Sequence, residues 1–365
     1  MGFYPGGLRL FLALGILCST IFSFYGCTQL GPRSISKGRA SYNEAITQTD
    51  NEQLLMSIVR GRYGETYNML AITAVAANIR FSANANAQVG IGPSENYVGN
   101  LVPLSSGVAY EENPTITYAP AQGAEFLRQL HSPVPLETLI LLIRTSRNPG
   151  GLFTMMVETI NGIRNPDFLP HGSKPDPRFS QFVRISGDLA DAHVLYWLRD
   201  ETIKEKFYFV LTGYDPKHIK DVNEILSMLG RSEPENKGQD IIIPVYFALR
   251  GKEWAGIGIT TRAPAELVDI MSACVHVPEE HSQSGVAITY PPLGLPGQGI
   301  QIRNSKGRPG KAWVAVKYRG YWFYIDETDQ PTKRAFGAVS TMWQSSIAAG
   351  AEQQPAPILT LPVSR

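Results

Sequence analysis

The longest regular pattern of hydrophobic and polar positions in this chain has a period of two. Between residues 79 and 91, apolar side chains such as Ile79 and Phe81 alternate with polar ones such as Arg80 and Ser82, or with glycine. Successive side chains of a strand point to opposite faces, so this alternation predicts one extended strand with an apolar face and a polar face.

The stretch that follows predicts a partner for this strand. A Gly-Pro pair at residues 92–93 interrupts the alternation, and apolar positions recur from Val108 to Tyr118. The whole stretch from Tyr67 to Ala124 contains only four charged residues. We therefore expect a long, charge-poor β-hairpin over residues 79–118.

Other segments show helical spacing or shorter strand patterns. A helical region is expected from about Gly38, and a capping box from Thr49 to Glu52 predicts the start of a helix in it whose apolar face includes Leu54 and Ile58. Further helices are expected over residues 122–131, from 136, and over 178–189, 217–229, 264–274 and 330–348. Strands are expected over residues 193–199, 206–212, 241–249, 312–318 and 321–325, and residues 155–165 fit a strand or a helix. Mixed hairpins and helices predict an α+β fold.

These elements divide the chain into six parts. Residues 166–178 hold four prolines and mixed charge, which is typical of a linker or long loop. The expected parts are a signal peptide (1–26), a lipidated tether (27–37), an N-terminal helical region with the hairpin (38–165), the loop (166–178), a C-terminal α+β domain (179–350) and a flexible tail (351–365).

The start of the chain has the layout of a secretory signal peptide: one positive charge at Arg9 and then an apolar stretch from Leu10 to Phe24. The dipeptide Gly26-Cys27 resembles the end of the lipobox of bacterial lipoproteins, in which the cysteine is acylated and becomes the mature N-terminus. We expect a lipid on Cys27, and Thr28 after it favours the outer membrane over the inner one.

Two other interpretations of this segment stay open. An ordinary cleaved signal peptide would leave no lipid, and an uncleaved stretch from Arg9 to Arg33 is long enough to cross a bilayer. Arg33, Lys37 and Arg39 follow the apolar run and outnumber the charge before it, which disfavours an anchor with its N-terminus inside.

Composition and cysteine content narrow the possible functions. The formal net charge is +1, which gives no electrostatic footprint for nucleic acid. Of the three cysteines, Cys18 would leave with the signal peptide and Cys27 would carry lipid. Cys274 would then be a lone thiol in an apolar run, and we expect a buried core residue rather than a disulfide or a nucleophile.

Two short motifs invite a chemical interpretation. His276 and His281 flank Glu279 and Glu280, but they are five residues apart with Pro278 between them, whereas zinc-binding helices place two histidines four apart. We expect a solvated loop without metal. A Ser-x-x-Lys spacing at residues 34–37 lacks its partner motifs and is interpreted as chance.

Two further motifs are interpreted as packing. The Gly-x-Gly at residues 256–258 predicts close backbone packing rather than a dinucleotide site. The aromatic residues between Tyr318 and Tyr324 fit cross-strand packing better than a binding platform. The other histidines are scattered, so we expect no catalytic residue, no cofactor and no metal.

Several segments together look like a family of uncharacterised Gram-negative lipoproteins. They are Asn51–Leu55 with Ile58–Arg60 and Arg62–Tyr63, Asn113–Tyr118 leading to Gly123, Glu125 and Phe126, Ile160–Asn165, and Phe323–Asp326. The resemblance spans most of the mature chain and implies an envelope location and one integrated unit. It implies no activity, substrate or site residue.

Three functions are compatible with these patterns. The first is a non-enzymatic envelope lipoprotein, lipid-anchored at the outer membrane and facing the periplasm, that serves as a scaffold or accessory subunit for envelope proteins. The second is an oligomeric outer-membrane pore or secretion-channel component, in which a ring of copies would each donate the hairpin of residues 79–118. The third is an envelope hydrolase whose site is assembled from residues distant in sequence.

Overall fold

The structure is a computed structural model that describes residues 30–65, 69–76, 79–86, 105–112, 115–121, 124–146, 148–203, 205–232, 240–248, 256–352 and 359–362. The described residues combine helices with a mixed sheet of six strands and an antiparallel sheet of three strands, which confirms the predicted α+β fold class. The chain divides into two units, residues 1–55 and 56–365, which are described separately.

The described part of the first unit is helical. Helix α2 covers Leu30–Arg62, so its last residues belong to the second unit. The prediction that a helix begins at Thr49 is wrong, because this hydroxyl donates to the carbonyl of Ala45 one turn earlier, at 3.0 Å. Residues 30–37, expected to be a tether, are helical too. Pro32 fits because the first turn leaves its N–H groups unpaired in any helix.

The second unit is built on the six-stranded sheet, in the order β6-β5-β10-β9-β8-β7. The strands are β5 (Val157–Ile160), β6 (Ile163–Arg164), β7 (Leu195–Arg199), β8 (Phe207–Leu211), β9 (Ile241–Phe247) and β10 (Ile257–Thr261). All neighbours are antiparallel except β9 and β10, which are parallel. The hairpin of β7 and β8 and the strand β9 confirm the sequence predictions.

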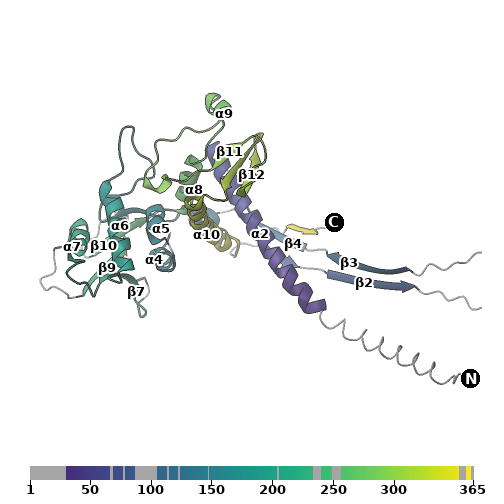
Figure 1. Cartoon of the computed structure of the whole chain (residues 1–365), viewed down its shortest axis with the longest axis horizontal. Helices are drawn as coiled ribbons and strands as arrows, with labels where there is room; N and C mark the ends of the chain where they lie inside the picture. Colours follow the sequence, from purple (N-terminus) through teal and green to yellow (C-terminus); the bar gives the residue numbers. More distant parts are fainter. Residues whose placement is uncertain are drawn as a thin grey trace, which may run out of the picture. The chain divides into compact units, whose positions relative to one another are not determined.

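Helices pack on this sheet and on one another (Figure 1). They are α3 (Ala124–His131), α4 (Leu136–Thr145), α5 (Pro149–Met156), α6 (Pro177–Asp191), α7 (Ile219–Met228), α8 (Pro264–Ala273), α9 (Glu279–Gln283) and α10 (Gln330–Glu352), with a 3₁₀ turn at Leu295–Gly297. Phe153 of α5 lies 5.8 Å from Phe182 of α6 and 5.9 Å from Trp197 of β7, measured between ring centroids. These aromatic rings join the helical layer to the sheet.

The loop at residues 166–178 does not separate two domains. Strand β5, in the part expected to be N-terminal, pairs with β10 of the part expected to be C-terminal. The segment of residues 155–165 combines the end of α5 with the β5–β6 hairpin, which turns on Asn161 and Gly162, both with positive φ. Sequence patterns reveal local elements but not this long-range pairing.

A second sheet has the order β11-β13-β12, with β11 at Arg303–Ser305, β12 at Ala312–Tyr318 and β13 at Tyr321–Asp326. Its hairpin turns on Arg319 and Gly320, whose φ angles are 45° and 85°. Both central residues of such a turn need positive φ, which glycine adopts freely. The predicted hairpin is confirmed.

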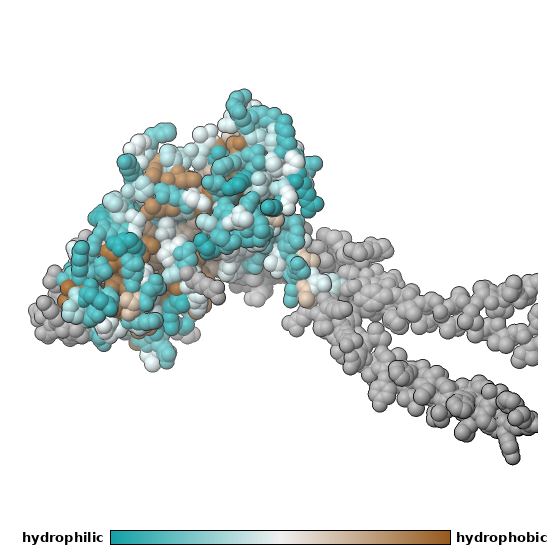
Figure 2. All heavy atoms as spheres, in the orientation of Figure 1, coloured by the Kyte–Doolittle hydropathy of each residue, from teal (hydrophilic) through white to brown (hydrophobic). Residues whose placement is uncertain are grey.

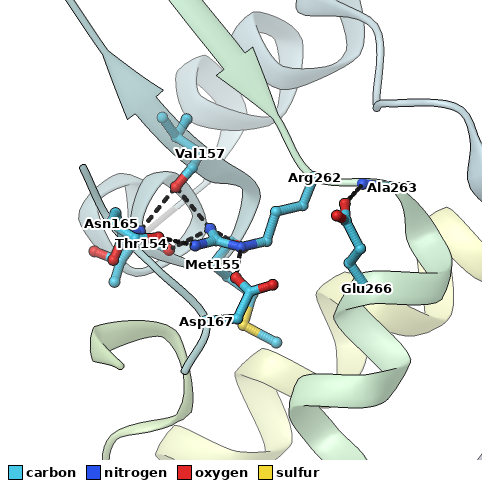
Figure 3. Close-up of polar contacts among 8 residues, drawn as sticks. All are labelled: Thr154, Met155, Val157, Asn165, Asp167, Arg262, Ala263 and Glu266. Carbon is cyan, nitrogen blue, oxygen red and sulfur yellow. Dashed lines mark hydrogen bonds and ion pairs between the residues drawn. The ribbon is translucent and has the colours of Figure 1, made fainter. Parts of the chain in front are cut away.

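A buried arginine joins the segments around the end of β10. Arg262 is 1% exposed, and its guanidinium forms an ion pair with the Asp167 carboxylate (Figure 3). It also donates to the carbonyls of Met155 at 3.0 Å and Val157 at 2.6 Å, and to that of Asn165. Burial lowers the pKa of Arg262, and the neighbouring carboxylates oppose that change.

The main chain around Arg262 ties in two more segments. Its N–H donates to Met156 at 2.8 Å, and its carbonyl accepts from the N–H of Val134, before α4, at 3.0 Å. The next residue, Ala263, donates to the Glu266 carboxylate at 2.6 Å and so caps α8 (Figure 3). One residue therefore connects α4, α5, β5, the loop after β6, and α8.

We predict that Arg262→Met lowers the free energy of unfolding by about 3–5 kcal/mol, because it leaves the Asp167 carboxylate and several carbonyls without their donor. Urea denaturation followed by circular dichroism measures this change. The matched control is Arg178→Met, since Arg178 pairs with Asp176 on the surface with 61% of its side chain exposed. Equal losses of unfolding free energy in the two variants would show that the buried network of Arg262 stabilises the protein no more than the surface ion pair does.

Candidate functional site

Four strands near the start of the second unit form two antiparallel pairs (Figure 1). The pairs are β1 (Met69–Ala76) with β4 (Thr115–Ala121), and β2 (Ile79–Asn86) with β3 (Ser105–Glu112). The pairing of β2 with β3 agrees with the predicted hairpin. The rest of the expected first strand, residues 87–91, lies outside the described residues.

The two pairs share one register. Ala76 lies opposite Thr115 and Ile79 lies opposite Glu112, so the same number of residues, two, separates the pairs on each side. We use the name ribbon for the four strands β1–β4; among the described residues, β1 and β4 belong to one sheet and β2 and β3 to another. The sequence did not reveal β1, because Met69–Ala76 is apolar or small at nearly every position and shows no alternation.

The register partly matches the chemistry of the two faces of β2 and β3. Phe81 pairs with Tyr110, so two aromatic positions meet on the face that also holds Ala83. On the other face, the register pairs Arg80 with Glu111. Three positions of β3 break the pattern: Glu112 opposite Ile79, Ala109 opposite Ser82 and Ser106 opposite Ala85. Strand β3 therefore continues the alternation of β2 only in part.

The edges of the ribbon differ along its length. Strand β14 (Leu359–Pro362) pairs with β4, so the C-terminal segment expected to be a loose tail contains a strand. This covers one edge from Thr115 to Tyr118. Among the described strands, β2 and β3 pair only with each other, which leaves both their outer edges without a partner.

A polar and aromatic cluster fixes the chain just before the ribbon. The Tyr63 hydroxyl lies 2.7 Å from Nδ1 of His281, and the Glu65 carboxylate accepts from the Tyr318 hydroxyl and, at 2.8 Å, from Arg319. The Arg319 guanidinium also lies 5.1 Å from the centre of the Tyr63 ring. The sequence predicted only a packing role for Tyr318, and its spacing in the chain did not indicate the hydrogen bond to Glu65.

This cluster is better suited to holding the chain in place than to acid–base or nucleophilic catalysis. Burial raises the pKa of Tyr63 to about 12, with a further contribution from the neighbouring Tyr318. A phenol with so high a pKa stays neutral near pH 7 and is a poor base or nucleophile. The hydrogen bonds and the ion pair instead hold the residues just after α2 against α9 and the β12–β13 hairpin.

His276 and His281 make separate contacts in the structure. His281 binds Tyr63, and His276 donates its main-chain N–H to Ile302 at 2.8 Å. Within the described ranges, no group of three or more His, Cys, Asp or Glu residues is placed to hold a metal ion. The stretch expected to be a solvated loop includes the short helix α9.

Another histidine, His218, has its Nδ1 atom 3.0 Å from the Asp215 carboxylate in the turn before α7. The spacing of these residues in the sequence did not suggest this contact.

The remaining candidate residues lie where packing explains them. Cys274 is 3% exposed, as expected, and burial raises the pKa of its thiol to about 12. A Cβ atom on Gly256 would lie 2.2 Å from the Pro244 carbonyl oxygen, which explains the predicted close packing. Ser34 and Lys37 lie within α2. Cys27 lies outside the described residues, so its lipid stays a prediction.

A search of the helices in the described part of the chain finds none with the length and hydrophobicity of a membrane span.

Comparison with models of protein families, with curated proteins and with solved structures finds no match in any of the three. The resemblance to a lipoprotein family therefore stays a prediction, and the geometry of the chain itself carries the functional argument.

We predict that the thiol of Cys274 in the folded protein reacts with a maleimide at pH 7 at least about 100-fold more slowly than it does in urea, because its high pKa and its burial both suppress the reactive thiolate. Mass spectrometry of the labelled protein over time measures the two rates. Fast labelling of the native protein would contradict the buried position.

Proposed function

We propose that this chain is a non-enzymatic, lipid-anchored envelope protein whose copies assemble through the ribbon into an oligomeric pore of the outer membrane. The observation that supports the proposal is the antiparallel pairing of β2 with β3, because both outer edges of this pair lack a partner among the described strands. The alternative is a scaffold or accessory subunit of an envelope complex that forms no pore.

The alternation of β2 suits a strand between lipid and water. Its apolar positions are Ile79, Phe81, Ala83 and Ala85, and its polar ones are Arg80, Ser82, Asn84 and Asn86. A membrane-spanning strand needs roughly nine to eleven residues with apolar side chains on the lipid side and polar ones on the other. The eight residues of β2 supply most of that length.

The open edges of β2 and β3 supply the reason for assembly. In lipid, every main-chain N–H and C=O group must be hydrogen-bonded within the protein, and a two-stranded ribbon leaves half of them unpaired. Copies arranged in a ring satisfy these groups, because β2 of one copy pairs with β3 of the next. Strand β14 covers β4, so we assign β2 and β3, rather than β1 and β4, to the membrane.

The lipid on Cys27 would hold each copy at the membrane before assembly. A single acyl chain binds a bilayer only weakly and reversibly, whereas several chains on one cysteine give stable anchoring. Anchoring confines the copies to a surface and raises their effective concentration for ring formation.

We predict that Ala83→Arg reduces the membrane-inserted, oligomeric fraction at least about tenfold, since an arginine facing lipid costs about 2–4 kcal/mol at mid-depth. The matched control Asn84→Arg places the same charge on the water-facing side and keeps the assembly, while it shifts the ion selectivity of the pore towards anions. Sizing in detergent, electron microscopy and conductance in planar bilayers measure these outcomes.

Equal loss of assembly in both variants would contradict the assignment of faces. A wild-type protein that remains a single particle in detergent, with no density across the micelle, would rule out the pore.

We predict that Cys27→Ala abolishes acylation of the mature N-terminus and moves most of the protein from the membrane fraction to the soluble fraction when the cells are fractionated. Mass spectrometry of the N-terminal peptide checks the modification. An unmodified mature N-terminus at another residue in the wild-type protein would show that the lipobox interpretation is wrong.

A further inference from the structure

Strand β7 lies at one edge of the six-stranded sheet, and its outer side is open among the described residues. Val194 accepts from the N–H of Thr212, and the N–H of Asp200 donates to Lys206. Hydrogen bonding to β8 therefore uses the even-numbered residues of β7, and the N–H and C=O groups of Leu195 and Trp197 point away from β8. No other strand in the described part of the chain pairs with β7.

A groove lies beside this edge. It has a volume of about 300 Å³ and is lined by β7 and by residues of α4, α5 and α6. Phe153, Phe182 and Trp197 supply aromatic surface, and Arg144 and Asp191 supply polar groups. The Ser186 hydroxyl is buried and has no hydrogen-bond partner among the described residues. An apolar lining with a few polar groups is typical of binding sites of this size.

The other face of β7 is also apolar and accessible. The side chains of Tyr196 and Leu198 are each 38% exposed, and Ile242 and Tyr246 of β9, on the same face of the sheet, are 61% and 40% exposed. Figure 2 shows apolar patches among polar residues on the visible face of the same unit. An added strand would find apolar neighbours on both of its faces.

We propose that this groove binds an extended peptide segment of a partner protein, which adds to β7 as a further strand. The outward main-chain groups of Leu195 and Trp197 would pair with the peptide backbone, and alternate peptide side chains, aliphatic or aromatic, would enter the groove. A small apolar ligand would fill the groove but would leave these main-chain groups unpaired. This inference is independent of the pore, because it uses none of the ribbon residues.

The expected occupant is therefore a strand with apolar residues at every second position and no requirement for net charge. Arg199 at the end of β7 forms an ion pair with Glu137 of α4, which ties the helix to the strand at that end. We expect the peptide to enter along Leu195 and Trp197.

The test uses the purified full-length protein and a pool of synthetic peptides of about seven residues, with valine, leucine or phenylalanine alternating with threonine and lysine. Binding is measured by fluorescence anisotropy, and amide hydrogen exchange is measured with and without the pool. Protection should increase at least about tenfold at the amides of Leu195 and Trp197 and stay nearly unchanged at Tyr196 and Leu198, which already bond to β8.

The blocking variant is Gly187→Phe. Gly187 lines the groove from α6, and no atom lies within 4 Å of a Cβ added there, so the helix accepts the side chain. We expect binding to weaken at least tenfold. The matched control is Gly337→Phe on α10, another helical glycine with open space that lies outside this groove, and it should bind like the wild type.

Several outcomes overturn the proposal. The first two are that no peptide of the pool binds, or that peptides bind without protecting the amides of Leu195 and Trp197. The third is that decanoate displaces the peptides, as expected if they only fill the cavity. The fourth is that the two phenylalanine variants bind the peptides equally well. Protection of the edge that rises with protein concentration in the absence of peptide would identify a second copy of this chain as the occupant instead.

Discussion

The arrangement of the second unit depends on one buried cation. The Arg262 guanidinium is enclosed and charged, so each of its donors must find an acceptor if burial is not to be prohibitively costly. Those acceptors are the Asp167 carboxylate and main-chain carbonyls around the junction of α5 and β5. These carbonyls lie at the end of α5 and the start of β5, where the regular hydrogen bonding of the helix gives way to that of the strand. The arginine supplies hydrogen-bond donors to them there. It thereby fixes where the helical layer ends and the sheet begins.

The same requirement for paired main-chain groups explains both functional hypotheses. The ribbon and the outer strand of the six-stranded sheet each present N–H and C=O groups that the described part of the chain leaves unpaired. Soluble proteins usually protect such edges with charged residues, bulges or covering helices. Here β2 carries one charge, Arg80, β3 carries two at one end, Glu111 and Glu112, and β7 carries one, Arg199. Edges so poorly protected are suited to pairing with other chains.

Local patterns predicted most of the second half of the fold. Strand patterns over residues 312–318 and 321–325 identified β12 and β13, and helical spacing over residues 264–274 identified α8. The helix start at Thr49 failed because a capping motif has the same composition inside a helix as at its beginning. Strand β14 was missed because a short apolar segment in a polar tail has no periodicity to read.

The candidate sites were less accessible to sequence reasoning than the fold. Alternation marked β2, but only the pairing with β3 showed that Phe81 meets Tyr110. The role of Arg262 had no signal at all, since a charged residue between a strand and a helix is normally exposed. The groove beside β7 gathers residues from four elements, and no spacing along the chain brings Phe153, Phe182 and Trp197 together.

Strand β14 also sets a condition on the order of folding. Leu359 pairs with Tyr118, so the sheet of β1, β4 and β14 joins residues near the start of the second unit to the last described residues of the chain. Contacts between such distant residues form slowly, because a long loop must close first. A chain exported from its N-terminus would therefore emerge with this edge uncovered, and the base of the ribbon would be completed only after translocation has finished. If the chain is exported as proposed, pairing of β14 with β4 would be among the last steps of its folding.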